Sequence, residues 1–435
     1  MKLIYVIFFL IIFFGCSENH MKSASSEWKN NLTIYEVNIR QYTKEGTISA
    51  FRKHLPRLKN MGVGILWFMP IHPIGKENRK GNLGSYYSVK DYYGVNSEFG
   101  TLDEFKLLVN EIHDMGMYVI LDWVANHTAW DNEIVYKHPK WYTKDDKDNF
   151  QPPIGTDWHD VIDLDYSNDS LRQYMADAMI YWVKEIDVDG FRCDVAGMVP
   201  KEFWENVIKN LNSIKPVFML AEWDNPELLK IGFDADYNWG FYHLLKDIAA
   251  GVKPVSKIQN YFQNDPKSYP WNALRMNFLD NHDENSWGRV MIEHFDSRVY
   301  PLATMIFTLP GIPMIYSGQE ARLNKKLKFF EKDNIPWGGY PDKDFYKALI
   351  EIRKEHAAFW CDNFSVYFLN ELPLGIVGYK RKTKNEEYLV FINLSDIRKK
   401  LNHDFSRGEI IFKDLNSDTM SLAPYGYMIY KNIKA

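Results

Sequence analysis

Four apolar runs of this 435-residue sequence end in an acidic side chain, and a further acid follows the last of them. Carboxylates gathered in one place repel one another and raise one another's pKa, so a cluster of them needs a chemical reason. Retaining hydrolysis of a glycosidic bond is such a reason, because it uses one ionised carboxylate and one protonated carboxylic acid about 5 Å apart. The residues concerned are Asp122, Asp194, Glu222, Asp280 and Asp283.

Arg192 and the surroundings of Glu222 indicate which acid would take which role. Arg192 lies two positions before Asp194, and side chains two apart on a strand point the same way. A guanidinium there would keep Asp194 ionised and nucleophilic. Glu222 stands between Ala221 and Trp223, where a carboxyl could keep a raised pKa and donate the proton.

Three further polar side chains could hold a sugar in such a site. Asp283 could bind sugar hydroxyls, and His127 and His282 could hydrogen-bond the same ring. Each feature also has a structural explanation, because an Asp at a strand end is usually a helix N-cap and an Arg/Asp pair is often a structural ion pair. Acidic strand ends could also hold a divalent metal. The combination, in chain order at the ends of successive strands, favours glycoside chemistry.

Alternating strand and helix patterns would position these groups. Apolar runs typical of strands and patterns typical of helices follow one another along most of the chain, which predicts parallel βαβ units. Eight such units indicate a (β/α)8 TIM barrel, in which catalytic groups lie at the C-terminal ends of the strands. A doubly wound open sheet is the alternative, but no G-x-G-x-x-G follows the first strand. The predicted strands are 32–38, 63–69, 117–122, 190–194, 217–222, 232–236, 274–280 and 313–317, and the predicted helices are 48–60, 102–115, 170–185, 201–211, 241–250, 298–308 and 344–356.

Two stretches depart from this alternation. The polar, aromatic segment that follows the third strand predicts an inserted loop domain, and five short β-type runs separated by turn residues predict a C-terminal antiparallel β-domain. We therefore expect a barrel in two parts, 28–126 and 169–358, with an insertion at 127–168 and a β-domain at 359–435.

The N-terminus has the pattern of a targeting segment. Residues 3–14 are twelve consecutive apolar residues, which as a helix would span about 18 Å and so fall short of a bilayer core of about 30 Å. We expect a signal peptide at 1–15. The ending Phe13-Phe14-Gly15-Cys16 resembles a bacterial lipobox, which implies lipidation of Cys16 and a polar tether at 16–27. A plain signal peptide is the alternative. The remaining cysteines, Cys193 and Cys361, are expected to be free thiols.

Composition limits the classes of partner. Lys and Arg number 52 and Asp and Glu 57, which gives a net charge of −5 and argues against nucleic-acid binding. Aromatic residues make up 16% of the chain. They could simply fill a core, or they could stack on sugar rings in a cleft.

Four separate segments resemble, in order and spacing, the signature regions of the α-amylase family of glycoside hydrolases. That resemblance implies a nucleophile at Asp194, a general acid/base at Glu222 and a transition-state stabiliser at Asp283. It also implies that His127, Arg192 and His282 line the subsite of the cleaved sugar, with Asp122 supporting it. A further stretch, Tyr86–Tyr92, resembles the family segment whose tyrosine stacks in that subsite, which places this role on Tyr87. The four segments are Asp122–His127, Gly190–Asp194, Ala221–Trp223 and Phe278–Asp283.

The resemblance also bears on calcium. Many members of the family carry Lys-His shortly after the nucleophile, where this chain has Ala196-Gly197-Met198. Asn126 and Asp163 still match common calcium-ligand positions, so a calcium ion is a possible cofactor. No organic cofactor is expected.

The resulting expectation is an exported retaining hydrolase of α-glucans such as starch or maltooligosaccharides, held at a bacterial membrane through a lipid anchor. A transglycosylase of the same family would use the same covalent intermediate. A non-catalytic glycan-binding lipoprotein on the same barrel is a further alternative.

Overall fold

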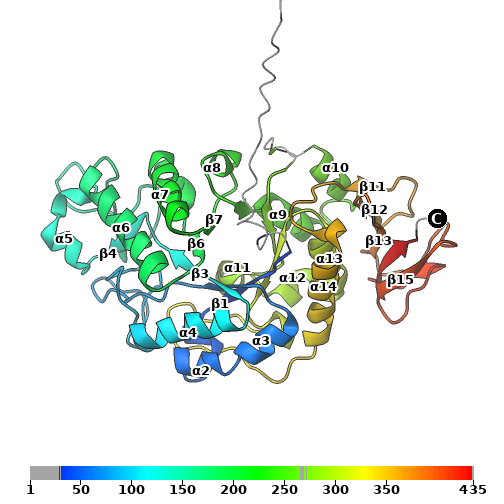
Figure 1. Ribbon diagram of the computed structural model, residues 1–435, viewed down its shortest axis with the longest axis horizontal. Coiled ribbons are helices and arrows are strands. Elements are labelled where there is room, and N and C mark those ends of the chain that lie inside the picture. The colour runs from blue at the N-terminus through cyan, green and yellow to red at the C-terminus, as the bar shows by residue number, and fades with distance from the viewer. Residues whose placement is uncertain (1–28, 30, 265–268, 271, 434–435) are drawn as a thin grey trace, which may run out of the picture.

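A closed barrel of eight parallel strands forms the centre of the computed structural model, which describes residues 29, 31–264, 269–270 and 272–433 (Figure 1). Neighbouring strands around the barrel are hydrogen-bonded in the order β1-β10-β9-β8-β7-β6-β3-β2. The expected TIM barrel is therefore confirmed, and the open-sheet alternative is wrong. The strands are β1 (Ile34–Val37), β2 (Ile65–Phe68), β3 (Tyr118–Trp123), β6 (Gly190–Cys193), β7 (Phe218–Ala221), β8 (Ala235–Tyr237), β9 (Arg275–Asn277) and β10 (Ile312–Tyr316).

Burial on both faces explains why these strands read as nearly continuous apolar runs. The helices that connect parallel strands cover the outside of the barrel, while side chains fill its inside. Every residue of β1 and β2 is buried. Among the charged residues that interrupt this pattern inside the barrel, Glu36 on β1 and Arg192 on β6 are fully buried. Buried charges need partners, so both residues point to the site described below.

Six of the seven predicted helical patterns match single helices closely. In α4 a capping box joins Thr101 and Glu104, and buried residues recur at helical spacing. The pattern at 48–60, predicted as one helix, forms α2 (Ile48–Arg52) and α3 (Leu55–Met61), because Pro56 lacks an N–H and starts a new helix. The others are α4 (Leu102–Asp114), α6 (Asp169–Glu185), α7 (Lys201–Ile214), α9 (Trp239–Ala249), α13 (Val299–Thr308) and α14 (Lys343–Glu355).

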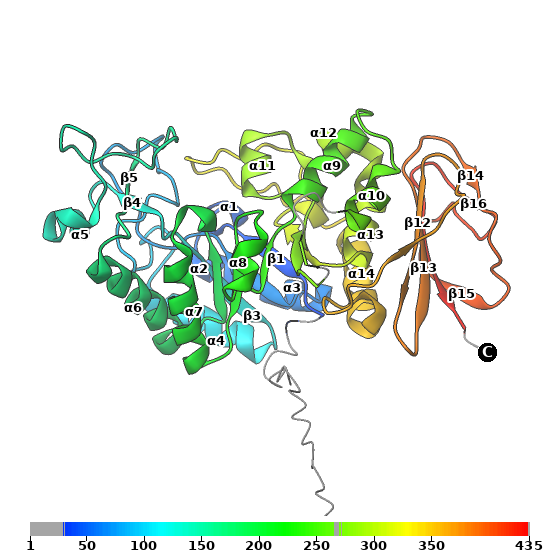
Figure 2. The same ribbon diagram turned by 90° about the horizontal axis from the view of Figure 1, so that it is seen from above.

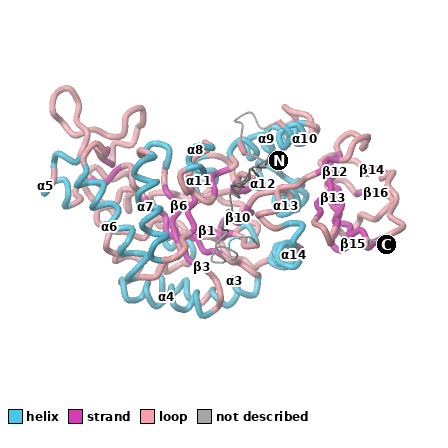
Figure 3. The backbone as a smooth tube through the Cα atoms, turned by 45° about the horizontal axis from the view of Figure 1, so that its top comes forward, coloured by secondary structure: helices cyan, strands magenta, loops and turns pink. Residues whose placement is uncertain are grey.

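The segment between β3 and α6 leaves the barrel, as expected for an inserted loop domain. It contains two short antiparallel strands, β4 (His127–Ala129) and β5 (Val161–Asp163), and the helix α5 (Glu133–Lys137). Figure 3 shows that most of the segment is loop. Figure 2 shows it at one end of the molecule, with the C-terminal sheet at the other.

The C-terminal sheet is antiparallel, as predicted, and buries both of its faces. Its strands lie in the order β11-β12-β13-β17-β15, with a separate pair of β14 and β16. One face, which includes Tyr379 and Ile429, joins the core of the barrel, and the other packs on Leu401 and Leu422. The strands are β11 (Tyr367–Phe368), β12 (Ile376–Lys382), β13 (Glu387–Asn393), β14 (Lys399–Lys400), β15 (Gly408–Lys413), β16 (Ser421–Leu422) and β17 (Tyr427–Asn432).

Two buried arginines, one on the sheet and one on a barrel helix, bond the C-terminal end of α13, where the sheet meets the barrel. Arg381 of β12 donates to the carbonyl of Thr308, the last residue of α13, and Arg353 of α14 donates to the carbonyl of Phe307. A helix C-terminus carries unpaired carbonyls and partial negative charge, which cationic side chains stabilise. The hydroxyl of Tyr379 lies 2.6 Å from that of Thr308, so the seam between sheet and barrel is polar at its centre.

The predicted signal peptide, Cys16 and the tether lie outside the described residues. Cys193 and Cys361 are both buried and free, as predicted. In the part of the chain that the structure describes, no helix is both long enough and apolar enough to span a bilayer.

Candidate active site

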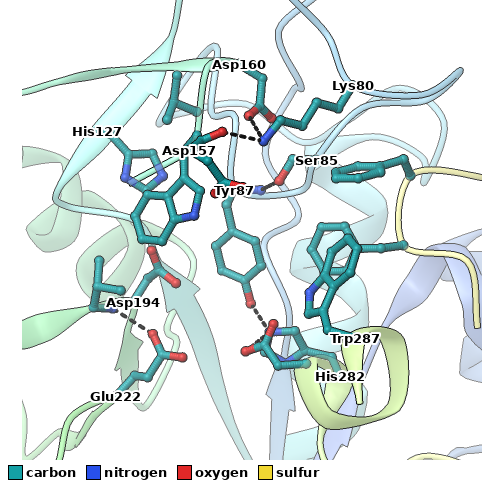
Figure 4. Close-up of a pocket in the computed structure, with 16 residues that line it drawn as sticks. Lys80, Ser85, Tyr87, His127, Asp157, Asp160, Asp194, Glu222, His282 and Trp287 are labelled. Atoms are coloured by element: carbon teal, nitrogen blue, oxygen red, sulfur yellow. Dashed lines mark hydrogen bonds and ion pairs between the residues drawn. The ribbon is translucent and has the colours of Figure 1, made fainter. Parts of the chain in front are cut away.

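A cavity of about 450 Å³ opens at the C-terminal ends of the barrel strands (Figure 4). It contains six of the eight side chains predicted to act on or bind a sugar: Tyr87, His127, Asp194, Glu222, His282 and Asp283. The other two, Asp122 and Arg192, are fully buried and contact these side chains from within the barrel. The structure therefore brings together all eight residues from five separate parts of the sequence.

The barrel ladder sets the spacing of the two central carboxyl groups. Cys193 and Ala221 are paired at the ends of β6 and β7, so Asp194 and Glu222 are the next residues on adjacent strands. The amide of Glu222 donates to the carbonyl of Cys193 at 3.0 Å, which continues the ladder by one bond. The side chains consequently project into one cavity from neighbouring positions.

Arg192 contacts three carboxylates at once. Its Nη1 donates to Asp122 Oδ1 at 2.8 Å and to Asp194 Oδ1 at 3.0 Å, while Nη2 lies 2.7 Å from Glu222 Oε1. Its Nε donates to the hydroxyl of Tyr237 at 3.1 Å. One fully buried cation cannot neutralise three buried anions, so the site favours a proton on one of the three.

Glu222 is the best candidate for that proton. Burial, with the charges of Asp194 and Asp283, raises the pKa of Glu222 to about 8 against the opposing effect of Arg192. Burial also raises the pKa of Asp194, which Arg192 again opposes. The two acids thus have different proton affinities, the condition for one to act as an acid and the other as a base.

Tyr87, His282 and Asp283 form the opposite side of the cavity. The Tyr87 hydroxyl donates to Asp122 Oδ2 at 3.1 Å and lies 2.8 Å from His282 Nε2. Asp283 Oδ2 is 3.3 Å from the same nitrogen. The rings of Tyr87 and His282 lie nearly parallel, at an interplanar angle of 24°. These contacts fix a flat aromatic face next to the carboxyl groups, as a sugar ring requires.

Glu36 is a residue that sequence reasoning missed. Its Oε1 lies 2.5 Å from His282 Nδ1, and its other oxygen is buried with no hydrogen-bond partner. Burial lowers the pKa of His282, but Asp283 and Glu36 more than compensate and raise it to about 9. Glu36 therefore orients the imidazole and favours its protonated form. A single charged residue inside the apolar first strand was the available signal.

Replacing Glu36 by Gln should lower the pKa of His282, because a neutral amide stabilises the imidazolium less than a carboxylate does. We expect the loss to cost roughly tenfold in kcat/KM, the difference between a charged and a neutral hydrogen bond. Histidine NMR titration of both proteins measures the shift directly. An unchanged His282 titration would show that Glu36 has no electrostatic role.

Two backbone features around Asp194 also escaped sequence reasoning. Val195 has φ 37°, a left-handed conformation that a β-branched residue rarely adopts, and its amide donates to Glu222 Oε2 at 2.7 Å. A Cβ on Gly197 would lie 2.2 Å from the ring of Trp223. Any larger residue at position 197 would therefore require the Trp223 ring to move.

The two predicted calcium ligands lie near one another. Asp163 pairs with His127 across β4 and β5, next to Asn126. The Asp163 carboxylate already accepts from the Thr143 hydroxyl at 2.9 Å. The described residues hold no group of three or more His, Cys, Asp or Glu that could bind a metal, whereas calcium takes six to eight oxygens. Calcium stays a prediction, and melting curves in chelator and in added calcium would test it.

His127 lies in the cavity between the insertion and the barrel. Burial lowers the pKa of His127 to about 3, so its imidazole is neutral at ordinary pH. Its ring lies 5.4 Å from that of Trp158, centroid to centroid. His127 can therefore act as a hydrogen-bond partner for a bound hydroxyl, while Trp158 shields it from solvent.

Comparison with known proteins agrees with this geometry. Alpha-amylase 2 of Dictyoglomus thermophilum is 26% identical over 440 residues, which cover 91% of this chain and 75% of that protein. A solved alpha-amylase from Lactobacillus plantarum has a TM-score of 0.83 and 30% identity over 93% of this chain and 99% of its own. A noncanonic maltogenic alpha-amylase from Thermotoga neapolitana has a TM-score of 0.82 and 31% identity, with the same coverage. The family description "Alpha amylase, catalytic domain" matches residues 20–355. The protein therefore belongs to the alpha-amylase family of glycoside hydrolases.

Proposed function

We propose that the protein is a retaining α-glucan hydrolase in which Asp194 is the nucleophile, Glu222 the general acid/base and Asp283 the stabiliser of the transition state. The observation that carries this proposal is the single guanidinium of Arg192, which lies 3.0 Å from one oxygen of Asp194 and 2.7 Å from one of Glu222. Two carboxyl groups held by one guanidinium are close together, which favours retention over the wider separation of inverting enzymes.

The reaction would run in two displacements. Glu222 gives its proton to the glycosidic oxygen as the bond to the anomeric carbon breaks, and an oxygen of Asp194 forms a new bond to that carbon. The shortened glucan leaves with the proton. Glu222, now ionised, takes a proton from water, and the water oxygen displaces Asp194 from the sugar. Both carboxyl groups return to their initial states.

The remaining side chains of the cavity would hold the cleaved sugar. The face of Tyr87 would stack on the ring, while His282 and Asp283 would hydrogen-bond its hydroxyls. Arg192 would keep Asp194 ionised, and Asp122 would hold both Arg192 and Tyr87 in place. Relatives of this protein are named alpha-amylases. We therefore infer that its substrates are α-linked glucose polymers or oligomers.

A product profile tests the proposed function. Purified protein is incubated with starch, maltodextrin, pullulan and isomaltose, and products are separated by chromatography while NMR follows the anomeric configuration. We expect hydrolysis of α-1,4-linked substrates with initial release of α-anomers. Initial β-anomers would contradict retention, and no cleavage of any substrate would contradict the proposal. Products longer than the substrate would identify transglycosylation.

The pH dependence of kcat/KM should reflect the burial of both acids. Burial raises the pKa of Asp194 and of Glu222. The acid and alkaline limbs of the pH–rate profile should therefore both lie above the usual carboxyl range near pH 4. Activity falls on the acid side as Asp194 gains a proton, and on the alkaline side as Glu222 loses its proton above about pH 8. Rates on a soluble maltooligosaccharide across this range provide the measurement, and an optimum at pH 4 to 5 would contradict it.

We further propose that the protein is anchored in a bacterial membrane through lipid on Cys16, with domain boundaries near residues 126, 168 and 358. The position of Lys29, the first described residue, supports a tether on the side of the barrel opposite the cavity. Lys29 Nζ donates to the carbonyl of Val217 at 2.6 Å and pairs with Asp234 Oδ1 at 2.7 Å, at the N-terminal ends of β7 and β8. The cavity lies at the opposite ends of these strands.

Cys16→Ser should release an active protein from the membrane fraction, because the barrel does not depend on the lipid. Anchoring by a single acyl chain is weak, so the native protein should carry more than one. Membrane fractionation and mass spectrometry of the N-terminus test this. An unmodified N-terminus downstream of Cys16 in the native protein would overturn the anchor and leave an ordinary secreted hydrolase.

A further inference from the structure

One segment of the loop after β2 contributes Lys80 to the lining of the cavity and is held on both sides. We call residues 79–84 the bridging segment. On one side it is held by the insertion. Lys80 Nζ lies 3.1 Å from the carbonyl oxygen of Asp157 and 3.2 Å from Asp160 Oδ1. Figure 4 shows Lys80 and Asp160 together at the rim, across the cavity from Glu222.

On its other side the bridging segment is held by the loop that follows β10. The amide and side chain of Asn82 donate to the two carboxylate oxygens of Glu331, at 3.1 and 2.7 Å. The amide of Leu83 donates to the carbonyl of Phe330 at 3.0 Å. Gly81 has φ 65°, and a Cβ there would lie 2.5 Å from Phe330 Cβ. The two loops therefore touch along their backbones.

A buried arginine supports the bridging segment from below. Arg40, which is 1% exposed, donates to the carbonyls of Leu83 and Gly84 at 3.2 and 3.0 Å. Its guanidinium also stacks over the ring of Tyr86, 4.3 Å from the centroid. A loop with side-chain anchors at both ends and a buried support is a fixed wall.

The catalytic geometry indicates which end of a glucan meets this wall. Glu222 protonates the leaving oxygen, so the departing part of the chain lies on its side of the cavity. Figure 4 shows Glu222 and Trp287 on opposite sides, with Tyr87 between them. The retained sugars must therefore extend past Tyr87 toward Trp287 and the bridging segment.

An aromatic surface leads in that direction. The ring of Phe329 lies parallel to that of Tyr87 within 13°, with centroids 6.2 Å apart. Trp287 contacts both Phe329 and Phe330, and its side chain is 57% exposed within the cavity lining. An exposed Trp beside a catalytic site offers a face on which a second glucose can stack.

We propose that the bridging segment closes the retained-sugar end of the cleft, so that the protein accepts only a short non-reducing end and removes short oligosaccharides from chain ends. This inference rests on the proposed hydrolase function and specifies its substrate. A long glucan would enter by its non-reducing terminus and extend out of the cleft on the side of Glu222. Cleavage in the middle of a chain would require the glucan to pass through the wall.

The test compares two substrates that differ only at the terminus that the wall would meet. One is 4-nitrophenyl α-maltoheptaoside, and the other carries a 4,6-ethylidene block on its non-reducing sugar. We expect the native protein to cleave the free substrate roughly tenfold faster or more, because the blocked ring cannot be seated. Chromatography of early products should show one short released oligosaccharide.

Variants then assign the selectivity to the wall. Asn82→Ala combined with Glu331→Ala removes both side-chain hydrogen bonds to the loop after β10, and should bring the two rates toward equality. Glu133→Ala removes an exposed ion pair with Lys137 in the insertion and should leave the ratio unchanged. Melting temperatures show whether each variant is folded.

The possible outcomes distinguish failure of this inference from failure of the proposed hydrolase function. Equal cleavage of free and blocked substrates by the native protein would overturn the closed end while leaving the hydrolase intact. No cleavage of either would overturn the proposed function. A native preference for the free substrate that survives in the folded double variant would show that the bridging segment does not cause it.

Discussion

Asp194→Asn is expected to reduce kcat by about 10⁴-fold or more, the scale of losses seen when a covalent nucleophile is removed. The amide keeps the size of the carboxylate but cannot form the glycosyl intermediate. Arg192 retains its contacts to Asp122 and Glu222, so the buried guanidinium is still paired and the fold should persist. Initial rates on a maltooligosaccharide measure the loss.

Asp177→Asn is a matched control for that substitution. Asp177 lies on the exposed side of α6 and accepts a hydrogen bond from Gln173, so its replacement should leave activity near the native level. Circular dichroism and melting temperature establish that both variants are folded. Near-native hydrolysis by purified Asp194→Asn would refute its assignment as nucleophile.

Glu222→Gln is expected to discriminate between leaving groups. A maltooligosaccharide leaves as a poor alkoxide and needs a proton, so its cleavage should fall by roughly 10²–10⁴-fold, the range for loss of a general acid. Fluoride needs no such help, and formation of the glycosyl-enzyme from α-glucosyl fluoride should be largely spared. Because Gln cannot ionise, the alkaline limb of that step should also disappear.

Pre-steady-state rates with the fluoride isolate the first displacement from the second, in which Glu222 acts as a base. Equal losses on fluoride and maltooligosaccharide in the first step would count against Glu222 as the proton donor. Added azide, which needs no base to attack the glycosyl-enzyme, should raise the turnover of Glu222→Gln on the fluoride.

The barrel could be predicted from sequence because its signals are local. Strands buried on both faces produce apolar runs, and helices packed on one side produce a 3.6-residue repeat. The eight expected strands are all present, although β9 ends at Asn277 while the apolar run continues to Leu279. The cluster of carboxylates could be predicted because the C-terminal ends of parallel strands lie at one rim of the barrel. Residues at successive strand ends are therefore close in space.

The parts that could not be predicted depend on contacts between distant segments. Glu36 and His282 are 246 positions apart, and nothing near either residue shows that β1 and α11 (His282–Trp287) meet. The left-handed turn at Val195 contradicts the preference of valine and exists only because surrounding structure imposes it. The bridging segment likewise depends on the contact between Asn82 and Glu331. These residues lie in the loops after β2 and β10, the two strands that flank β1 in the barrel.

The seam between barrel and C-terminal sheet has a consequence for how this protein can be recombined. Arg381 of the sheet satisfies the carbonyl of Thr308 in the barrel, and a buried acceptor left unpaired costs about 1–3 kcal/mol. A barrel cut free near residue 358 would lose Arg381 and expose the apolar face beneath it. The sheet therefore cannot be exchanged as an independent module. A chimera that joins this barrel to a relative's sheet would need the contacting residues of the barrel and of the sheet to come from the same protein.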